Sequence, residues 1–203
     1  MANAESVSVL VTPSRVPEAA IDPIFVERWS SRALSDRPIS EELRRSLFEA
    51  ARWAPSASNS QPWLFVYASE EAELARARLL LRDSNRRWAG RAPLLIFVFA
   101  RKIHAETRQP LRTGAFDTGA AWLSLALQAE RLGLKTRAMG GILHELTYEA
   151  FDVPPDEFES QAAIAVGFPT SASELPADLA AKEAPTGRKL QREFAFAGRY
   201  VQR

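Results

Sequence analysis

Residues 54–63 read APSASNSQPW and join a helical pattern to an apolar run. Before this stretch, apolar residues repeat at helical spacing, and Ser40 stands where the N-cap of that helix is expected. After it, WLFVYA at 63–68 is short and continuously apolar, which predicts a buried strand. Helix capping and turn formation explain Pro55 and Ser56, but they explain poorly why one connection holds so many small hydrogen-bonding side chains.

Outward from this junction, the chain mixes helical and strand patterns irregularly. Further strands are predicted at 94–100 and 161–169. Further helices are predicted at 22–29, 69–81 (with Ser69 as its cap), 116–132 and 144–151. Residues 83–93 are predicted as a loop, 101–114 as a mobile loop and 136–142 as a compact turn. This irregular order favours an α+β fold over an alternating βαβ fold.

The helix predicted at 116–132 is apolar on most sides, so we expect it to be deeply buried and to end at Gly133. Large aromatic residues are interpreted mainly as core candidates, with Trp88 left open. These are Trp53, Trp63, Trp88, Trp122 and Phe116.

Composition limits the possible functions. The 203 residues are expected to form one domain, with arms at 1–23 and 185–203. A net charge of +1 gives no global field that would attract nucleic acid or an anionic membrane. No apolar stretch approaches the roughly 20 residues that cross a bilayer, and no leader pattern is visible, so we expect a cytoplasmic protein with neither nucleic acid nor membrane as its partner.

Common catalytic signatures are missing from the sequence. It contains no cysteine, no G-x-G-x-x-G, no P-loop, no G-x-S-x-G and no H-E-x-x-H. His104 and His144 are the only histidines, so a metal site is not expected, and His144 is interpreted as a surface or helix-cap residue. A hydrolase with two carboxylates stays open, because 25 acidic residues offer many pairs.

Two clusters do suggest chemistry. In RWSSR, Arg28, Ser30 and Arg32 alternate, and two guanidiniums with a hydroxyl can converge on a phosphate, although a solvated basic helix end is the commoner arrangement. Arg188 adds a basic residue near the carboxyl terminus. Asn59 offers a donor and an acceptor, which match the edge of a pyrimidine-like ring.

The order R-x-S-x-R followed by APSASNSQPW resembles the FMN-dependent nitroreductase family. Further segments match the family in the same order across roughly residues 24–190. They are RAPLLIFVFA (91–100), DTGAAWLSLALQAERLGL (117–134), MGGI (139–142), AVGFP (165–169) and Arg188. The resemblance implies a homodimer with FMN at the subunit interface and a central, mostly antiparallel sheet flanked by helices.

By position, the resemblance implies that Arg28, Ser30 and Arg188 hold the phosphate of FMN. Arg32 would lie near the ribityl chain and the pyrimidine edge, and Asn59 would hydrogen-bond that edge.

Pro55, Ser56 and Ala57 would meet the flavin of the other subunit. Gly140 and Gly141 would approach N5 of the ring, where only glycine lets a backbone N–H come close. The arm at 185–203 would pack on the partner subunit.

The family's activity implies hydride transfer from NAD(P)H, through the flavin, to a small planar acceptor such as a nitroaromatic or a quinone. Flavin carries that chemistry, so no catalytic side chain is expected. Two departures are visible: Gly140-Gly141 stands where many members have glutamate-glycine, and Thr186 where some have lysine. The alternatives are a dehalogenase, a flavin-cleaving enzyme or a ring dehydrogenase of the same fold, a flavin carrier or sensor, and a dimeric structural module without flavin.

Overall fold

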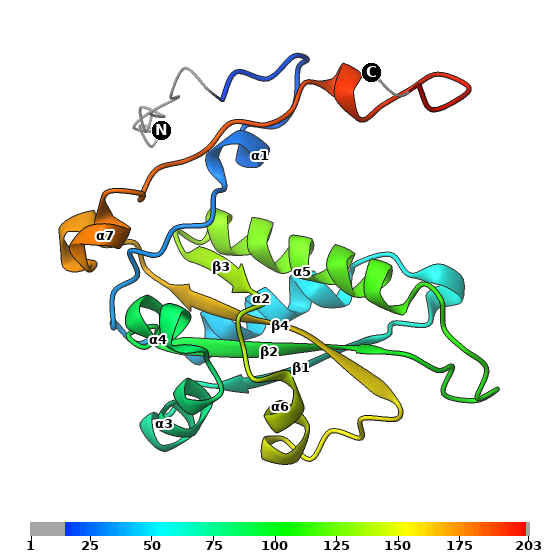
Figure 1. The fold of residues 1–203 in the computed structure, drawn as a ribbon, viewed down its shortest axis with the longest axis horizontal. Coiled ribbons are helices and arrows are strands. Elements are labelled where there is room, and N and C mark those ends of the chain that lie inside the picture. The colour runs from blue at the N-terminus through cyan, green and yellow to red at the C-terminus, as the bar shows by residue number, and fades with distance from the viewer. Residues whose placement is uncertain (1–14, 202–203) are drawn as a thin grey trace, which may run out of the picture.

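A four-stranded antiparallel sheet forms the centre of the computed structural model, which describes residues 15–201 (Figure 1). Its strands are β1 (Trp63–Ala68), β2 (Leu94–Arg101), β3 (Lys135–Met139) and β4 (Phe158–Gly167). They lie in the order β1, β2, β4, β3, so β1 and β3 are the two edges. Every neighbouring pair is antiparallel, which confirms the predicted α+β class.

Helices cover both faces of this sheet. One face packs against α2 (Glu41–Arg52) and α5 (Gly114–Arg131). The opposite face packs against α3 (Glu71–Leu79), α4 (Asp83–Ala89) and α6 (His144–Ala150). Alternate residues of β2 enter the two cores, Ile96 on the α5 side and Phe97 on the α3 side, which is why residues 94–100 of this strand are apolar without interruption.

Local sequence signals set the start of α2 and the end of α5. Ser40 Oγ accepts a hydrogen bond from the Leu43 N–H at 3.3 Å and caps α2, as predicted. Gly133, with φ of +71°, takes the left-handed conformation that ends α5.

The two ends of the described chain run beside each other and away from the sheet (Figure 1). The amino-terminal arm, residues 15–23, leads into α1 (Ile24–Glu27), and the carboxyl-terminal arm, residues 185–201, follows α7 (Ala177–Ala180). The Gln191 N–H donates to Glu18 at 2.6 Å and joins the arms. Short 3₁₀ turns complete the described elements: η1 (Ala57–Asn59), η2 (Ala172–Glu174) and η3 (Gln191–Glu193).

Three predicted elements are wrong or shifted. Residues 83–89, expected in a loop, form α4, because burial of Trp88 and Ala89 stabilises a short polar helix. The turn expected at 136–142 overlaps β3, which spans Lys135–Met139; an edge strand can accommodate the basic residues Lys135 and Arg137. A capping box of Glu70 and Glu73, not Ser69, starts α3.

Burial also departs from the sequence prediction. β1 is mostly half-buried, because it is an edge strand with a neighbour on one side only. α5 is not buried all round: Phe116 is 81% exposed and Leu123 46% exposed, so one apolar stripe of this helix has no cover within the described chain. Trp53 is 74% exposed, whereas Trp88 belongs to the core.

Candidate functional site

The RWSSR segment lies beside the edge strand β3. The Arg137 guanidinium, on β3, donates to the Ser30 carbonyl. Glu183, which follows α7, holds residues 31–33 by hydrogen bonds. Its Oε1 accepts hydrogen bonds from Ser31 Oγ at 2.7 Å, Arg32 N at 2.6 Å and Ala33 N at 3.0 Å. The Glu183 side chain is only 3% exposed, and its Oε2 lies 3.5 Å from Arg32 Nη1. A buried carboxylate therefore fixes the residues around Arg32 against the sheet edge.

Three arginines lie near the start of β3, close to the carboxyl-terminal end of α5. They are Arg15, Arg28 and Arg188. Burial, followed by the charge of Arg188, lowers the pKa of Arg28. Burial, followed by the charges of Arg188 and Arg28, lowers the pKa of Arg15. Glu130 is the one carboxylate that opposes these shifts, and it is ion-paired with Lys135.

None of the three arginines forms an ion pair within residues 15–201. Arg28 Nη1 lies 3.5 Å from Ser30 Oγ, and Arg188 Nη1 donates only to carbonyls of its own segment, at 2.9 and 3.2 Å. Like charges held together without a counterion favour the binding of an anion. We call Arg15, Arg28 and Arg188 the arginine cluster.

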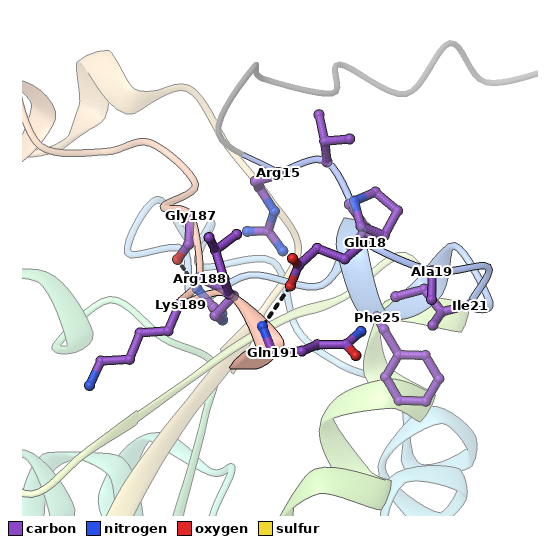
Figure 2. Close-up of a pocket in the computed structure, with 13 residues that line it drawn as sticks. Arg15, Glu18, Ala19, Ile21, Phe25, Gly187, Arg188, Lys189 and Gln191 are labelled. Carbon is purple, nitrogen blue, oxygen red and sulfur yellow. Dashed lines mark hydrogen bonds between the residues drawn. The ribbon is translucent and has the colours of Figure 1, made fainter. Parts of the chain in front are cut away.

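A pocket of about 220 Å³ opens between the two arms at this cluster (Figure 2). Arg15 and Arg188 line it, while Phe25 and Ile21 give it an apolar wall. It thus combines an apolar wall with cationic groups.

At the other end of β3, the Gly140-Gly141 turn has one open and one closed position. A Cβ on Gly140 would meet nothing within 4 Å. A Cβ on Gly141 would lie 2.5 Å from Asn85 Nδ2, an atom that donates to the Gly141 carbonyl at 2.9 Å. Glycine at 141 therefore leaves room for the Asn85 side chain of α4, and Gly140 leaves its surroundings accessible.

The His144 side chain is hydrogen-bonded to the same turn. Its Nε2 lies 3.1 Å from the Gly140 carbonyl and its Nδ1 3.0 Å from Ser160 Oγ. Because a carbonyl only accepts, Nε2 carries a hydrogen and donates it to Gly140. The sequence suggested a surface or helix-cap residue. In the structure His144 is the first residue of α6, after the N-cap Leu143, and it is half-buried and bonded to the turn.

The loop quoted from the sequence has a strained backbone. Ser58, Asn59 and Gln61 have φ values of 51°, 55° and 45°, a backbone conformation that residues other than glycine rarely adopt. The loop is fastened at Ala57, whose N–H donates to Asp117 Oδ2 at 3.1 Å. Asp117 is only 4% exposed. Strain held in place by a buried carboxylate is typical of functional loops.

The predicted site residues fall into two groups. Arg28, Ser30, Arg32 and Arg188 lie along β3 near the carboxyl-terminal end of α5, and Gly140 and Gly141 follow the same strand. Pro55, Ser56, Ala57 and Asn59 lie near the amino-terminal end of α5, at Asp117. Asp117 and Glu130 are thirteen residues apart in α5, so the two groups are about 20 Å apart along the helix at 1.5 Å per residue.

Four residues of this region were missed from the sequence. Arg15 lies in an arm without a regular pattern, and Glu183 in a tail without a recognisable motif, so neither carried a signal. Arg137 lies in β3, a short strand with two basic residues that showed no strand pattern in the sequence. Asn85 was hidden in the segment interpreted as a loop.

Residues 15–201 contain neither a candidate metal site nor a membrane-spanning helix. That part of the chain holds no group of three or more metal-ligating side chains. Among its helices, none is both long and apolar enough to cross a bilayer.

Comparison with known proteins identifies the family. The model of the Nitroreductase family matches residues 25–87 and 71–168. A Xanthomonas oryzae protein named "Putative NADH dehydrogenase/NAD(P)H nitroreductase" is 30% identical over 143 residues, 61% of this chain and 72% of its own length. A Leptothrix cholodnii protein of the same name is 33% identical, over 60% of this chain and 68% of its own.

Solved structures with the same fold support this family assignment. A crystal structure described as an oxidoreductase containing FMN superposes with a TM-score of 0.89 and 41% identity, covering 95% of this chain and 98% of the other. An FMN complex from Desulfovibrio desulfuricans shares the fold, with a TM-score of 0.67 and 23% identity, covering 90% of this chain and all of the other. The chain belongs to the nitroreductase family.

Proposed function

We propose that this protein binds FMN along the outer edge of β3 and acts as an oxidoreductase, with NAD(P)H as hydride donor and a small planar acceptor such as a nitroaromatic or a quinone. The observation that carries the proposal is the arginine cluster, which has no ion-pair partner among residues 15–201 and lies near the start of β3, the strand that leads to the open Gly140 turn. Similar proteins are described as containing FMN.

The phosphate of FMN fits the arginine cluster. Arg28 and Arg188 would each donate forked hydrogen bonds to the dianion, and Ser30 would add a hydroxyl. Burial and then the charge of Arg188 lower the pKa of Arg28, and a dianion between the guanidiniums would compensate both effects.

The ring fits the open end of β3. Gly140 has free space at its Cβ position, and its carbonyl is engaged by His144 and by the Ile142 N–H at 2.9 Å. Among the described residues, the Gly141 N–H has no hydrogen-bond acceptor, so it is free to donate to N5 of a flavin. Arg32 would lie beside the ribityl chain and the pyrimidine edge, where its charge would favour the reduced, anionic ring. Bound FMN supplies the redox chemistry, and the chain's residues bind, orient and shield it.

A second copy of the chain would complete the site. The exposed stripe of Phe116, Gly119 and Leu123 gives α5 an apolar face for a two-fold contact. If two α5 helices pack antiparallel, each copy's loop at 55–59 moves to the end of the partner's α5 where the arginine cluster lies. The loop residues Pro55, Ser56, Ala57 and Asn59 would then contact FMN bound to the partner, although they are remote from the cluster of their own chain.

The carboxyl-terminal arm supports this arrangement. Residues 186–195 are exposed throughout, and Phe194 and Tyr200 are 64% and 72% exposed. Covering such apolar groups with a partner subunit would remove the unfavourable exposure.

The first experiment is to purify the chain, record its visible spectrum and titrate FMN by fluorescence quenching. We expect a yellow protein or saturable quenching. NADH and NADPH oxidation should then be measured with quinone and nitroaromatic acceptors. A colourless protein that quenches no FMN fluorescence would overturn the proposal; flavin binding without turnover would leave a flavin carrier.

A further inference from the structure

We propose that Arg15, in the amino-terminal arm, is a third phosphate-binding arginine of the flavin site and ties that arm to bound FMN. This inference rests on the proposed FMN site and adds to it a residue outside the family's matched segment, which begins at residue 25.

The first observation is an unsatisfied donor. Arg15 Nη2 donates to the Arg28 carbonyl at 3.0 Å, so the side chain is held in one place. Its Nη1 is buried and has no hydrogen-bond partner among residues 15–201. A buried donor that is part of a charged group is costly to leave unpaired, so an acceptor is expected next to it.

The second observation is the charge around Arg15. Besides burial, the two charges that lower its pKa are those of Arg188 and Arg28. Glu18 lines the same pocket, but its carboxylate accepts the Gln191 N–H at 2.6 Å and forms no ion pair with Arg15. The acceptor is therefore expected to be an anion from outside the described chain.

Geometry identifies the kind of anion. Arg15 comes from the amino-terminal arm, Arg28 from the segment after α1 and Arg188 from the carboxyl-terminal arm, and Figure 2 shows Arg15 and Arg188 on the wall of one pocket. Guanidiniums that converge from several directions suit the tetrahedral oxygens of a phosphate monoester better than a planar carboxylate. The phosphate proposed for Arg28 and Arg188 is such a group.

The test compares FMN with riboflavin, which has the same ring and ribityl chain but no phosphate. Dissociation constants of both should be measured by fluorescence quenching for the parent, Arg15→Gln and Arg15→Lys. We expect Arg15→Gln to weaken FMN binding by about tenfold or more and to leave riboflavin binding within about twofold. Arg15→Lys, which keeps the charge, should recover part of the loss.

Lys189→Gln is the matched control. Lys189 lines the same pocket, but Figure 2 shows its side chain directed away from Arg15. Removing the same charge there should change the ratio of FMN to riboflavin affinity by less than about twofold.

Several outcomes would overturn the inference. Equal losses of FMN and riboflavin in Arg15→Gln would indicate a structural role, and unchanged FMN affinity would indicate no role. If Arg28→Gln loses FMN affinity while Arg15→Gln does not, the proposed function stands and only the role of Arg15 fails. A parent that binds no FMN would overturn both proposals.

Discussion

Replacing Glu183 by alanine should loosen the segment after α7 from residues 31–33 and lower the unfolding temperature. The carboxylate accepts hydrogen bonds from the Ser31 hydroxyl and from the N–H groups of Arg32 and Ala33, at 2.6 to 3.0 Å, and it is 3% exposed. Alanine would leave two backbone N–H groups and the Arg32 charge without their acceptor.

The magnitude follows from burial. Breaking a buried ion pair on one side costs about 3–5 kcal/mol. Because the Arg32 side chain is 21% exposed, water would replace part of the contact, which favours the lower half of this range. In a chain of 203 residues this corresponds to a fall in Tm of about 6–16 °C. Glu183→Gln keeps an oxygen acceptor but loses the charge, so we expect about 1–2 kcal/mol for this variant.

The assay is differential scanning calorimetry at one fixed protein concentration, since the stability of a dimer depends on concentration. Glu174→Ala is the control, because its ion pair with Arg91 is 40–45% exposed and should contribute little to stability. A Glu183→Ala protein that melts within about 2 °C of the parent would refute the reasoning.

Three further predictions concern the site. Arg28→Gln should weaken FMN binding by about ten- to a hundredfold without weakening riboflavin binding; equal losses in the two titrations would contradict a phosphate role. Gly141→Ala should lower Tm, because its Cβ would lie 2.5 Å from Asn85, whereas Gly140→Ala should melt like the parent and lose flavin affinity or turnover; the reverse order in calorimetry would count against our account of the turn. Asp117→Ala should cost about 1–3 kcal/mol by freeing the Ala57 N–H, and unchanged hydrogen exchange at Ala57 would exclude this anchoring role.

The strongest local patterns predicted the fold well. The strand at 63–68 and the Ser40 cap were confirmed, and β2 extends only one residue beyond its prediction, because uninterrupted apolar runs and a side-chain cap leave clear signals in the sequence. β3 and α4 were missed, because their stability comes from tertiary contacts: pairing with β4 for one and burial of Trp88 for the other.

The candidate site was predictable only as separate motifs. The sequence indicated Arg28, Ser30, Arg32 and Arg188, but it contained no sign that Arg15 would join Arg28 through an arm without secondary structure. Nor could it place the loop at 55–59 at the opposite end of α5 from the cluster. The distances between these segments are set by the folded sheet, so local sequence patterns do not reveal them.

The most direct test of the composite site is FMN binding by mixed dimers of Arg28→Gln and Asn59→Ala chains, co-expressed with different affinity tags and purified on both tags in turn. Each homodimer should bind FMN weakly at both sites. If every site takes the arginine cluster from one chain and the loop from its partner, one site of the mixed dimer has only unaltered residues. We predict parent-like affinity at half of the sites. Weak binding at all sites of the mixed dimer would contradict the account.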